Sequence, residues 1–174
     1  MNTNALTVLR QRRSIRKYKA EQITDAELNA VLEAGILAPS CMGKQSGLVI
    51  AVQNKDDIRQ LSTMNAAIMG KDIDPYYGAP TILLVLAAAD SPLPVEDGSA
   101  LTTYLMAAAA AAGLGSCWIN REKQMFDSPE GKALLQKWGV TGEYVGVAAC
   151  TLGYIDGDLP QPAPRKDGYV VRVK

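Results

Sequence analysis

The sequence predicts a single α+β domain spanning residues 1–174. Segments with helical and strand-like patterns alternate irregularly, which is typical of that class. No internal repeat or low-complexity linker divides the chain. Its 174 residues, 48% hydrophobic and 21% charged, are enough for one sizeable core. We therefore expect one unit of four or five helices and several strands, with residues 156–174 forming an extended C-terminal arm.

The first two helices are predicted by periodicity and capping. Apolar residues at helical spacing within residues 4–13 predict a short helix that delivers a basic cluster. Thr24 followed by Glu27 is typical of a capping box, so a second helix is expected to begin there. Pro39 sets the limit of this helix beyond Leu37.

The other elements follow from breakers and β-branched runs. Further helices are expected at residues 56–64, 99–113 and 128–138, the last with Ser128 as its N-cap, while residues 65–78 show no clear pattern. Residues 39–47 and 90–98 are interpreted as loops because proline, glycine, serine or aspartate interrupt any period. Strands or strand-like pieces are expected at residues 48–53, 81–86, 117–119, 144–154 and 169–173.

Charge and leader patterns exclude several classes of protein. Eighteen basic and eighteen acidic residues balance, so no net positive field attracts nucleic acid or anionic lipid. The N-terminus lacks the apolar core of a signal peptide, and no apolar run reaches the ~20 residues that span a bilayer. Cys41, Cys117 and Cys150 are odd in number and have no paired spacing, so we expect reduced thiols in a cytoplasmic protein.

The chain contains no histidine, which argues against a metal site and against hydrolase chemistry. Neither Ser116 nor Cys117 has the usual imidazole base beside it. Gly113-x-Gly115 lacks the third glycine of a dinucleotide fingerprint and follows a predicted helix, so it is interpreted as a helix stop. Gly43-Lys44 lacks the first glycine and the hydroxyl residue of a P-loop.

A dense cationic cluster is the strongest candidate site. Arg12, Arg13, Ser14 and Arg16 place three guanidiniums and a hydroxyl within five residues, which suits bidentate binding of a phosphate or polarised carbonyls. A solvated helix end is the alternative interpretation. Arg165 and Lys166, in a Pro-rich tail, are candidates for a second cationic arm at the same anion.

Four motifs in order resemble the nitroreductase family. They are Arg12-x-Ser14-x-Arg16, Ala38-Pro39-Ser40, Gly113-Leu114-Gly115-Ser116-Cys117-Trp118 and Pro164-Arg165-Lys166, accompanied by Gly78-Ala79-Pro80 and Leu152-Gly153-Tyr154. The resemblance covers nearly the whole chain. It implies a nitroreductase-like α+β fold with a central, mostly antiparallel sheet flanked by helices. It also implies an intertwined homodimer with FMN at the subunit interface and NAD(P)H as co-substrate.

The resemblance also implies a cofactor site. Arg12, Arg13, Ser14 and Arg16 would contact the FMN phosphate, ribityl chain and N1/C2 edge, and Arg165 and Lys166 would reinforce the phosphate. Pro39, Ser40, Met42 and Gln45 would reach the ring edge of the other subunit's flavin. Backbone at Ile119 and Asn120 would lie beside N5 and O4, and Asn65 would approach the ribityl or O2/N3 side unless it is an ordinary helix C-cap.

The loop departs from the commonest family pattern. Gly43 stands where an Asn is usual, and Ser46-Gly47 stands where a Pro-Trp pair follows the Gln. The shape of the substrate pocket is therefore left open, as is any lining role of Tyr76, Tyr77 or Tyr104, which equally fit core packing.

The expected activity is a ping-pong transfer of electrons from NAD(P)H through FMN to nitroaromatics, quinones or similar electron-poor small molecules. No protein acid or base is required, because the cofactor carries the chemistry while the protein supplies binding and electrostatics. One alternative is a flavin-binding storage or sensor protein without significant turnover. Another is a module without flavin whose arginines recognise a different anion or a protein partner.

Overall fold

The computed structural model describes residues 5–174, so Asn4, at the start of the first predicted helix, lies outside the described residues. None of the helices in the described part is long and apolar enough to cross a membrane. The elements are, in chain order, α1 (Ala5–Gln11), α2 (Asp25–Gly35), the short 3-10 helix η1 (Cys41–Gly43), β1 (Gly47–Val52), α3 (Lys55–Met69), β2 (Thr81–Ala88), α4 (Pro94–Ala111), β3 (Gly115–Ile119), α5 (Glu122–Asp127), α6 (Pro129–Lys137) and β4 (Tyr144–Gly153).

A four-stranded antiparallel sheet with the order β1-β2-β4-β3 forms the centre of the fold. Its strand β2 is buried on both faces. Ile82, Leu84 and Leu86 join one core cluster, whereas Leu83 and Val85 join the other. This two-sided burial explains the continuous apolar run in the sequence, and the antiparallel sheet with its flanking helices confirms the predicted α+β class.

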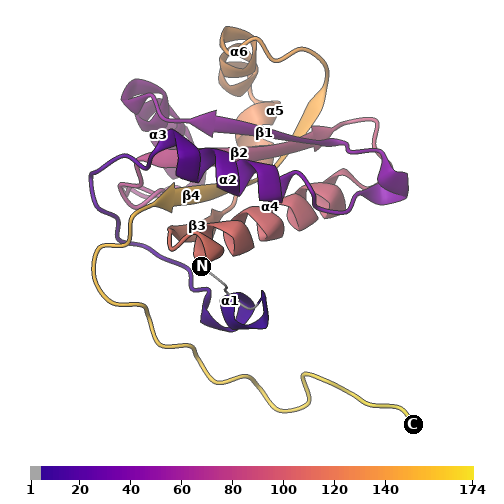
Figure 1. The fold of residues 1–174 in the computed structure, drawn as a ribbon. Coiled ribbons are helices and arrows are strands. Elements are labelled where there is room, and N and C mark those ends of the chain that lie inside the picture. Colours follow the sequence, from indigo (N-terminus) through magenta and orange to yellow (C-terminus); the bar gives the residue numbers. More distant parts are fainter. Residues whose placement is uncertain (1–4) are drawn as a thin grey trace.

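Two helical layers enclose the sheet (Figure 1). Side chains of α2 and α4 share the core cluster on one face, and side chains of α3, α5 and α6 share the cluster on the other. Small residues set the closest approaches. A Cβ at Gly35 would lie 2.3 Å from Leu105 of α4, and one at Gly98 would lie 2.5 Å from Val147 of β4. Glycine therefore lets α2 and β4 approach α4 closely.

Capping signals in the sequence are confirmed. Thr24 and Glu27 form both halves of the capping box at the start of α2. Ser128 accepts a hydrogen bond from Gly131 N at 3.1 Å at the start of α6, where Pro129 holds the first helical position.

Several predicted element bounds are wrong. Helix α4 begins at Pro94 rather than at residue 99, because Pro94 occupies the first helical turn instead of a loop. Helix α3 continues past the predicted end at residue 64 to Met69 and ends at Gly70, whose φ of 67° is left-handed. Helix α2 ends at Gly35, two residues before the predicted limit at Leu37.

Two further expectations need correction. Helix α5 was not predicted, because no side chain caps its start and its six residues are too few for a clear period. The strand expected over residues 169–173 is absent from the described structure, since no other strand runs beside this segment. Instead, residues 157–174 are all exposed, and the chain runs away from the body past α1 (Figure 1).

Candidate functional site

The arginine segment, residues 12–16 between α1 and α2, lies along the sheet edge that β3 forms. Ser14 forms a parallel bridge with Ser116 of β3, and Ile15 N donates to Ser116 O at 2.9 Å. Tyr18 forms a further bridge with Ile155. The extended backbone buries Ile15 and Tyr18 in the core and holds the intervening Arg16 outside it.

Arg12 and Arg13 line a hollow of about 170 Å³ beside α1, together with Ser116 and Leu159. Arg13 Nε donates to Pro160 O at 3.0 Å, which ties the start of the tail to this segment. Arg12 Nη1 is buried and has no hydrogen-bond partner in the described residues. A buried guanidinium nitrogen without an acceptor is costly, so this position suits an anion.

Arg16 is covered by Tyr77. Its guanidinium carbon lies 5.9 Å from the centroid of the Tyr77 ring, and the hydrogen bond with Tyr77 is the main cause that raises the pKa of Arg16. Tyr77 has a left-handed φ of 58°. The turn is held by Asp74, whose carboxylate accepts from Tyr76 N at 2.9 Å and from Gly78 N at 2.6 Å. Sequence reasoning left Tyr77 open between pocket and core, and the structure places it on Arg16.

A buried polar group centres on Asn65. This side chain is fully buried within α3, so the alternative of a helix C-cap is wrong. Its Nδ2 donates to Asn120 O at 3.0 Å, and its Oδ1 accepts from Arg121 Nε at 2.7 Å. The structure thus joins the predicted residues Asn65 and Asn120, with Ile119 buried beside them at 4% exposure.

Glu122 completes this group. The side chain is fully buried; its Oε1 is 3.5 Å from Asn65 Nδ2, and its Oε2 has no partner among the described residues. Burial raises the pKa of Glu122 to about 8. Arg121 belongs to the Trp118–Arg121 stretch that the family resemblance sets beside N5 and O4, but sequence reasoning gave its side chain no role. Glu122 was missed, although it directly follows that stretch.

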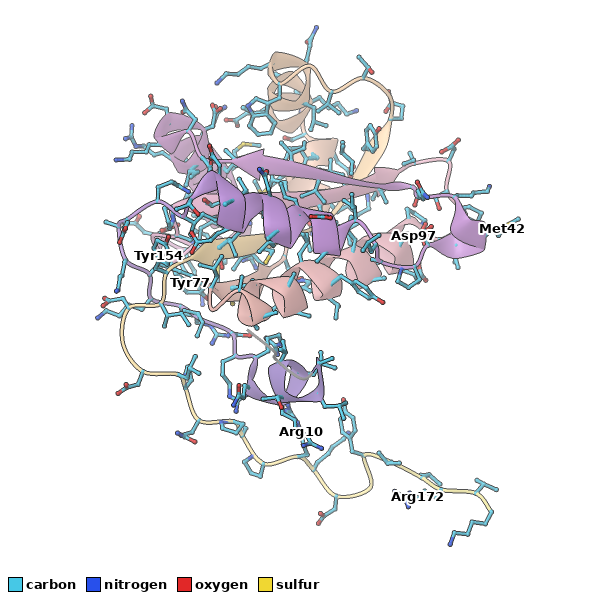
Figure 2. The ribbon with its side chains drawn as sticks, viewed as in Figure 1. Arg10, Met42, Tyr77, Asp97, Tyr154 and Arg172 are labelled. Atoms are coloured by element: carbon cyan, nitrogen blue, oxygen red, sulfur yellow. The ribbon has the colours of Figure 1, made fainter. Side chains whose placement is uncertain are left out.

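The loop of residues 39–45 lies elsewhere on the molecule. Figure 2 shows Met42 and Asp97 at one end of the fold and Tyr77 and Tyr154 at the other. Pro39, Ser40 and Gln45 line a hollow of about 320 Å³ with residues 36–38 after α2, with Gly47 and Val49 of β1, and with Asp97 and Leu101 of α4. Met42 is 81% exposed and points away from the body.

Asp97 fixes this loop to the first turn of α4. Its carboxylate accepts from Cys41 N at 2.6 Å, from the Ser46 hydroxyl, and from Ser91 Oγ at 3.0 Å. These hydrogen bonds lower the pKa of Asp97, so it is a carboxylate at neutral pH.

Arg165 and Lys166 are exposed in the tail. Lys166 Nζ lies 6.0 Å from the centroid of the Tyr169 ring. In the described part of the chain, neither Arg165 nor Lys166 forms an ion pair with the arginine segment. One chain therefore gathers Arg12, Arg13, Ser14 and Arg16 along β3 and joins Asn65 to Asn120. It leaves the loop and the tail cations apart from both groups.

Comparison with known proteins places this geometry in a family. The chain is 30% identical to a protein of Archaeoglobus fulgidus provisionally named NADH dehydrogenase/NAD(P)H nitroreductase, over 94% of this chain and 88% of that relative. The chain belongs to the nitroreductase family. The family model itself matches residues 9–76, a region that holds the arginine segment, the loop and Asn65.

Solved nitroreductases share the whole fold. A nitroreductase with bound FMN from Bacteroides fragilis superposes with a TM-score of 0.90 and 29% identity, covering 99% of this chain and 100% of that one. Another with bound FMN, from Desulfitobacterium hafniense, has a TM-score of 0.88 and 25% identity, with both chains fully covered. The predicted resemblance to the nitroreductase family is therefore confirmed.

Proposed function

We propose that this nitroreductase-family oxidoreductase binds FMN and passes electrons from NAD(P)H to nitroaromatics, quinones or similar electron-poor small molecules by a ping-pong mechanism. The observation that carries the proposal is the buried, partnerless Nη1 of Arg12, which lies in an arginine segment aligned along β3. A phosphate there would satisfy this donor, and solved relatives with the same fold bind FMN by name.

The cationic groups are proposed to bind the two ends of the cofactor. Arg12, Arg13 and Ser14 would hold the phosphate and ribityl chain. Arg16 would face the N1/C2 edge of the ring, where a positive charge favours the reduced form. Arg165 and Lys166 would reinforce the phosphate once the tail is ordered against it. The donors are guanidiniums and hydroxyls, the groups that suit phosphate and polarised carbonyls.

The remaining predicted residues are proposed to frame the ring. The backbone of Ile119 and Asn120 would lie beside N5 and O4, and Asn65 on the O2/N3 side. In the described chain the Asn65 amide holds the Asn120 carbonyl, so these two contacts are already tied together. Ile119 itself is buried in the core, at 4% exposure.

A homodimer is part of the proposal. Met42, in the loop that also contains Pro39, Ser40 and Gln45, lies at the opposite end of the fold from Tyr77, which covers Arg16 (Figure 2). The loop of one subunit would therefore complete the ring-edge contacts of the other. Catalysis would then depend on association of two chains, as the family resemblance implies.

When bound, FMN supplies the two-electron chemistry, taking hydride from NAD(P)H and passing it to the acceptor. The chain supplies position and charge. It needs no histidine for this, and its buried thiols are not nucleophiles, because burial raises the pKa of Cys117 and raises that of Cys150 to about 12. NAD(P)H and the acceptor would occupy the same cavity in turn.

The first experiment is an absorbance spectrum of the purified protein, before and after anaerobic NADH or NADPH, then after a nitroaromatic or a quinone. A yellow protein that bleaches within the mixing time and regains its colour on adding the acceptor supports the proposal. A yellow protein that bleaches only over hours would favour the storage or sensor alternative. Colourless protein that cannot be reconstituted with FMN would overturn the proposal.

A further inference from the structure

The hydrogen bond between Arg121 and Asn65 connects two segments proposed above to contact neighbouring sides of the flavin ring. Asn65 is proposed to face the O2/N3 side of the ring, and Ile119 and Asn120 the N5/O4 side. Asn65 Oδ1 accepts from Arg121 Nε at 2.7 Å, while Asn65 Nδ2 donates to Asn120 O at 3.0 Å. The Arg121 side chain is therefore bound to the same Asn65 amide that holds the Asn120 carbonyl, and its guanidinium would lie at the pyrimidine edge of a bound ring.

The backbone of Arg121 adopts a conformation that a side chain disfavours. Its φ of 90° is left-handed, a region where glycine is unstrained and longer residues are uncommon. Arg121 occupies the N-cap position of α5 but makes no side-chain capping bond there. Helix capping thus does not account for the arginine. Strained residues that persist in a fold cluster at ligand sites.

The charge of Arg121 is not cancelled by a neighbour. None of the ion pairs in the described part of the chain includes it. The adjacent Glu122 is fully buried, and burial raises its pKa to about 8, so this carboxyl is mostly neutral at pH 7. The half-buried Arg121 guanidinium is therefore held by the Asn65 amide and has no carboxylate partner among the described residues.

We propose that Arg121 is a second cation for the flavin ring, acting at the pyrimidine edge and stabilising the negative charge of reduced FMN. Asn65 is its positioning residue. This inference rests on the proposed function. Hydride from NAD(P)H brings two electrons and one proton, NAD(P)⁺ leaves, and the ring gains one negative charge that Arg121 and Arg16 share. Arg121 itself exchanges no proton.

The test is the anaerobic midpoint potential of the FMN-loaded protein, read against a reference dye. Arg121→Gln keeps hydrogen-bonding capacity but removes the charge. Arg121→Gly removes the charge and also relieves the left-handed strain, so it folds even where Arg121→Gln does not. Arg59→Gln is the matched control, because Arg59 is exposed on α3 and its ion pair in the described chain is with the exposed Asp56.

Arg121→Gln and Arg121→Gly are each expected to lower the preference of the protein for reduced over oxidised FMN about tenfold. For a two-electron couple, this change makes the midpoint potential about 30 mV more negative. Arg59→Gln is expected to leave the potential unchanged. Arg121→Lys, which keeps the charge, should restore part of the shift. If both Arg121 variants bind FMN at the wild-type potential, this inference is overturned while the proposed function stands. Wild-type protein that does not bind FMN would overturn both.

Discussion

At the scale of single residues, Tyr77 shows how one turn prepares a binding group. The Asp74 carboxylate caps Tyr76 N and Gly78 N and is itself held by Ser62 Oγ at 2.7 Å. This arrangement sends Tyr76 into the core at 0% exposure and turns Tyr77 outward over Arg16. The left-handed φ of Tyr77 is therefore maintained by the turn, and the ring limits where the Arg16 guanidinium can lie.

We expect Tyr77→Ala to weaken FMN binding by about two- to fivefold, the size of an exposed cation–π contact. Tyr77→Phe should lose less, because the ring remains and only the hydroxyl is removed. The measurement is FMN titration of the apoprotein by quenching of flavin fluorescence. Ile68→Ala is the control, since Ile68 is 42% exposed on α3 and has no proposed role. Equal affinity for Tyr77→Ala and the control would refute the role.

The raised pKa of Glu122 predicts that the free energy of unfolding depends on pH. Its pKa is about 8 in the folded chain against 4.5 in the unfolded chain, so the folded state holds the proton more tightly. Stability therefore falls as pH rises from about 4.5 to about 8. Below this window both states are protonated, and above it both are ionised and the loss is complete.

Glu122→Gln removes this titration while keeping the shape of the side chain. The free energy of unfolding of the variant relative to wild type is expected to grow by about 1 kcal/mol for each pH unit between pH 5 and 8. Urea unfolding of FMN-free protein at several pH values measures it. A difference that stays constant across this range would show that Glu122 is ionised in the fold.

At the scale of elements, the loop of residues 39–45 depends on α4 for its position. Met42 and Gln45 both have left-handed φ values, 53° and 52°, and the turn has no apolar side chain of its own in the core. From the first turn of α4, the Asp97 carboxylate accepts two hydrogen bonds from this region, from Cys41 N and the Ser46 hydroxyl. Its third hydrogen bond comes from Ser91, in the loop before α4. We infer that Asp97 is the main anchor of the loop.

Asp97→Asn is expected to loosen the loop, because its amide nitrogen would face donors instead of accepting from them. Trypsin should then cleave after the exposed Lys44 at least several-fold faster than in wild type. Asp90→Asn, an exposed site in the loop before α4, serves as the control. Mass spectrometry of timed digests identifies the cut, and an unchanged rate at Lys44 would argue against the anchor.

The elements that sequence reasoning located are those with local signals. Thr24 and Glu27 define the start of α2, and the apolar run of β2 needs no distant partner to be recognised. The start of α4 was missed because Leu93, at its N-cap, offers no capping side chain. Helix α5 was missed because its contact with β4 stabilises it. The contact needs a glycine, since a Cβ at Gly146 of β4 would lie 2.3 Å from the carbonyl oxygen of Glu122.

The candidate site also has a part with a local sequence signal and a part without one. The arginine segment is contiguous, so its charge density alone predicts a site. Arg121 is a single cation after a strand, and its relevance depends on Asn65, which is 56 positions away and contacts it only in the folded chain. Tyr77 likewise gains a role only when the Asp74 turn places it on Arg16. Long-range contacts of this kind leave no periodic trace in a sequence.

At the scale of the whole molecule, the described chain has an exposed apolar tail. Tyr169, Val170, Val171 and Val173 are between 71% and 94% exposed, and the segment from residue 157 onward leaves the body of the fold (Figure 1). Exposed apolar surface of this extent typically marks an interface. In the proposed homodimer, this tail would be buried against the other chain.

The tail therefore provides the test of the homodimer. A Val171→Asp, Val173→Asp double variant should raise the dimer dissociation constant at least about tenfold, because each buried valine contributes about 1.5 kcal/mol and the new charges resist burial. Sedimentation velocity over a range of concentrations measures this, with FMN content followed in the same cells. Gln161→Glu is the control, since it adds a negative charge to the tail without removing an apolar side chain. Because the loop of residues 39–45 would reach the flavin only across the interface, FMN should be lost along with the dimer. A wild-type chain that sediments as a monomer at every concentration and still retains FMN would show that one protomer suffices, and the proposed role of this loop at the ring edge would then be wrong.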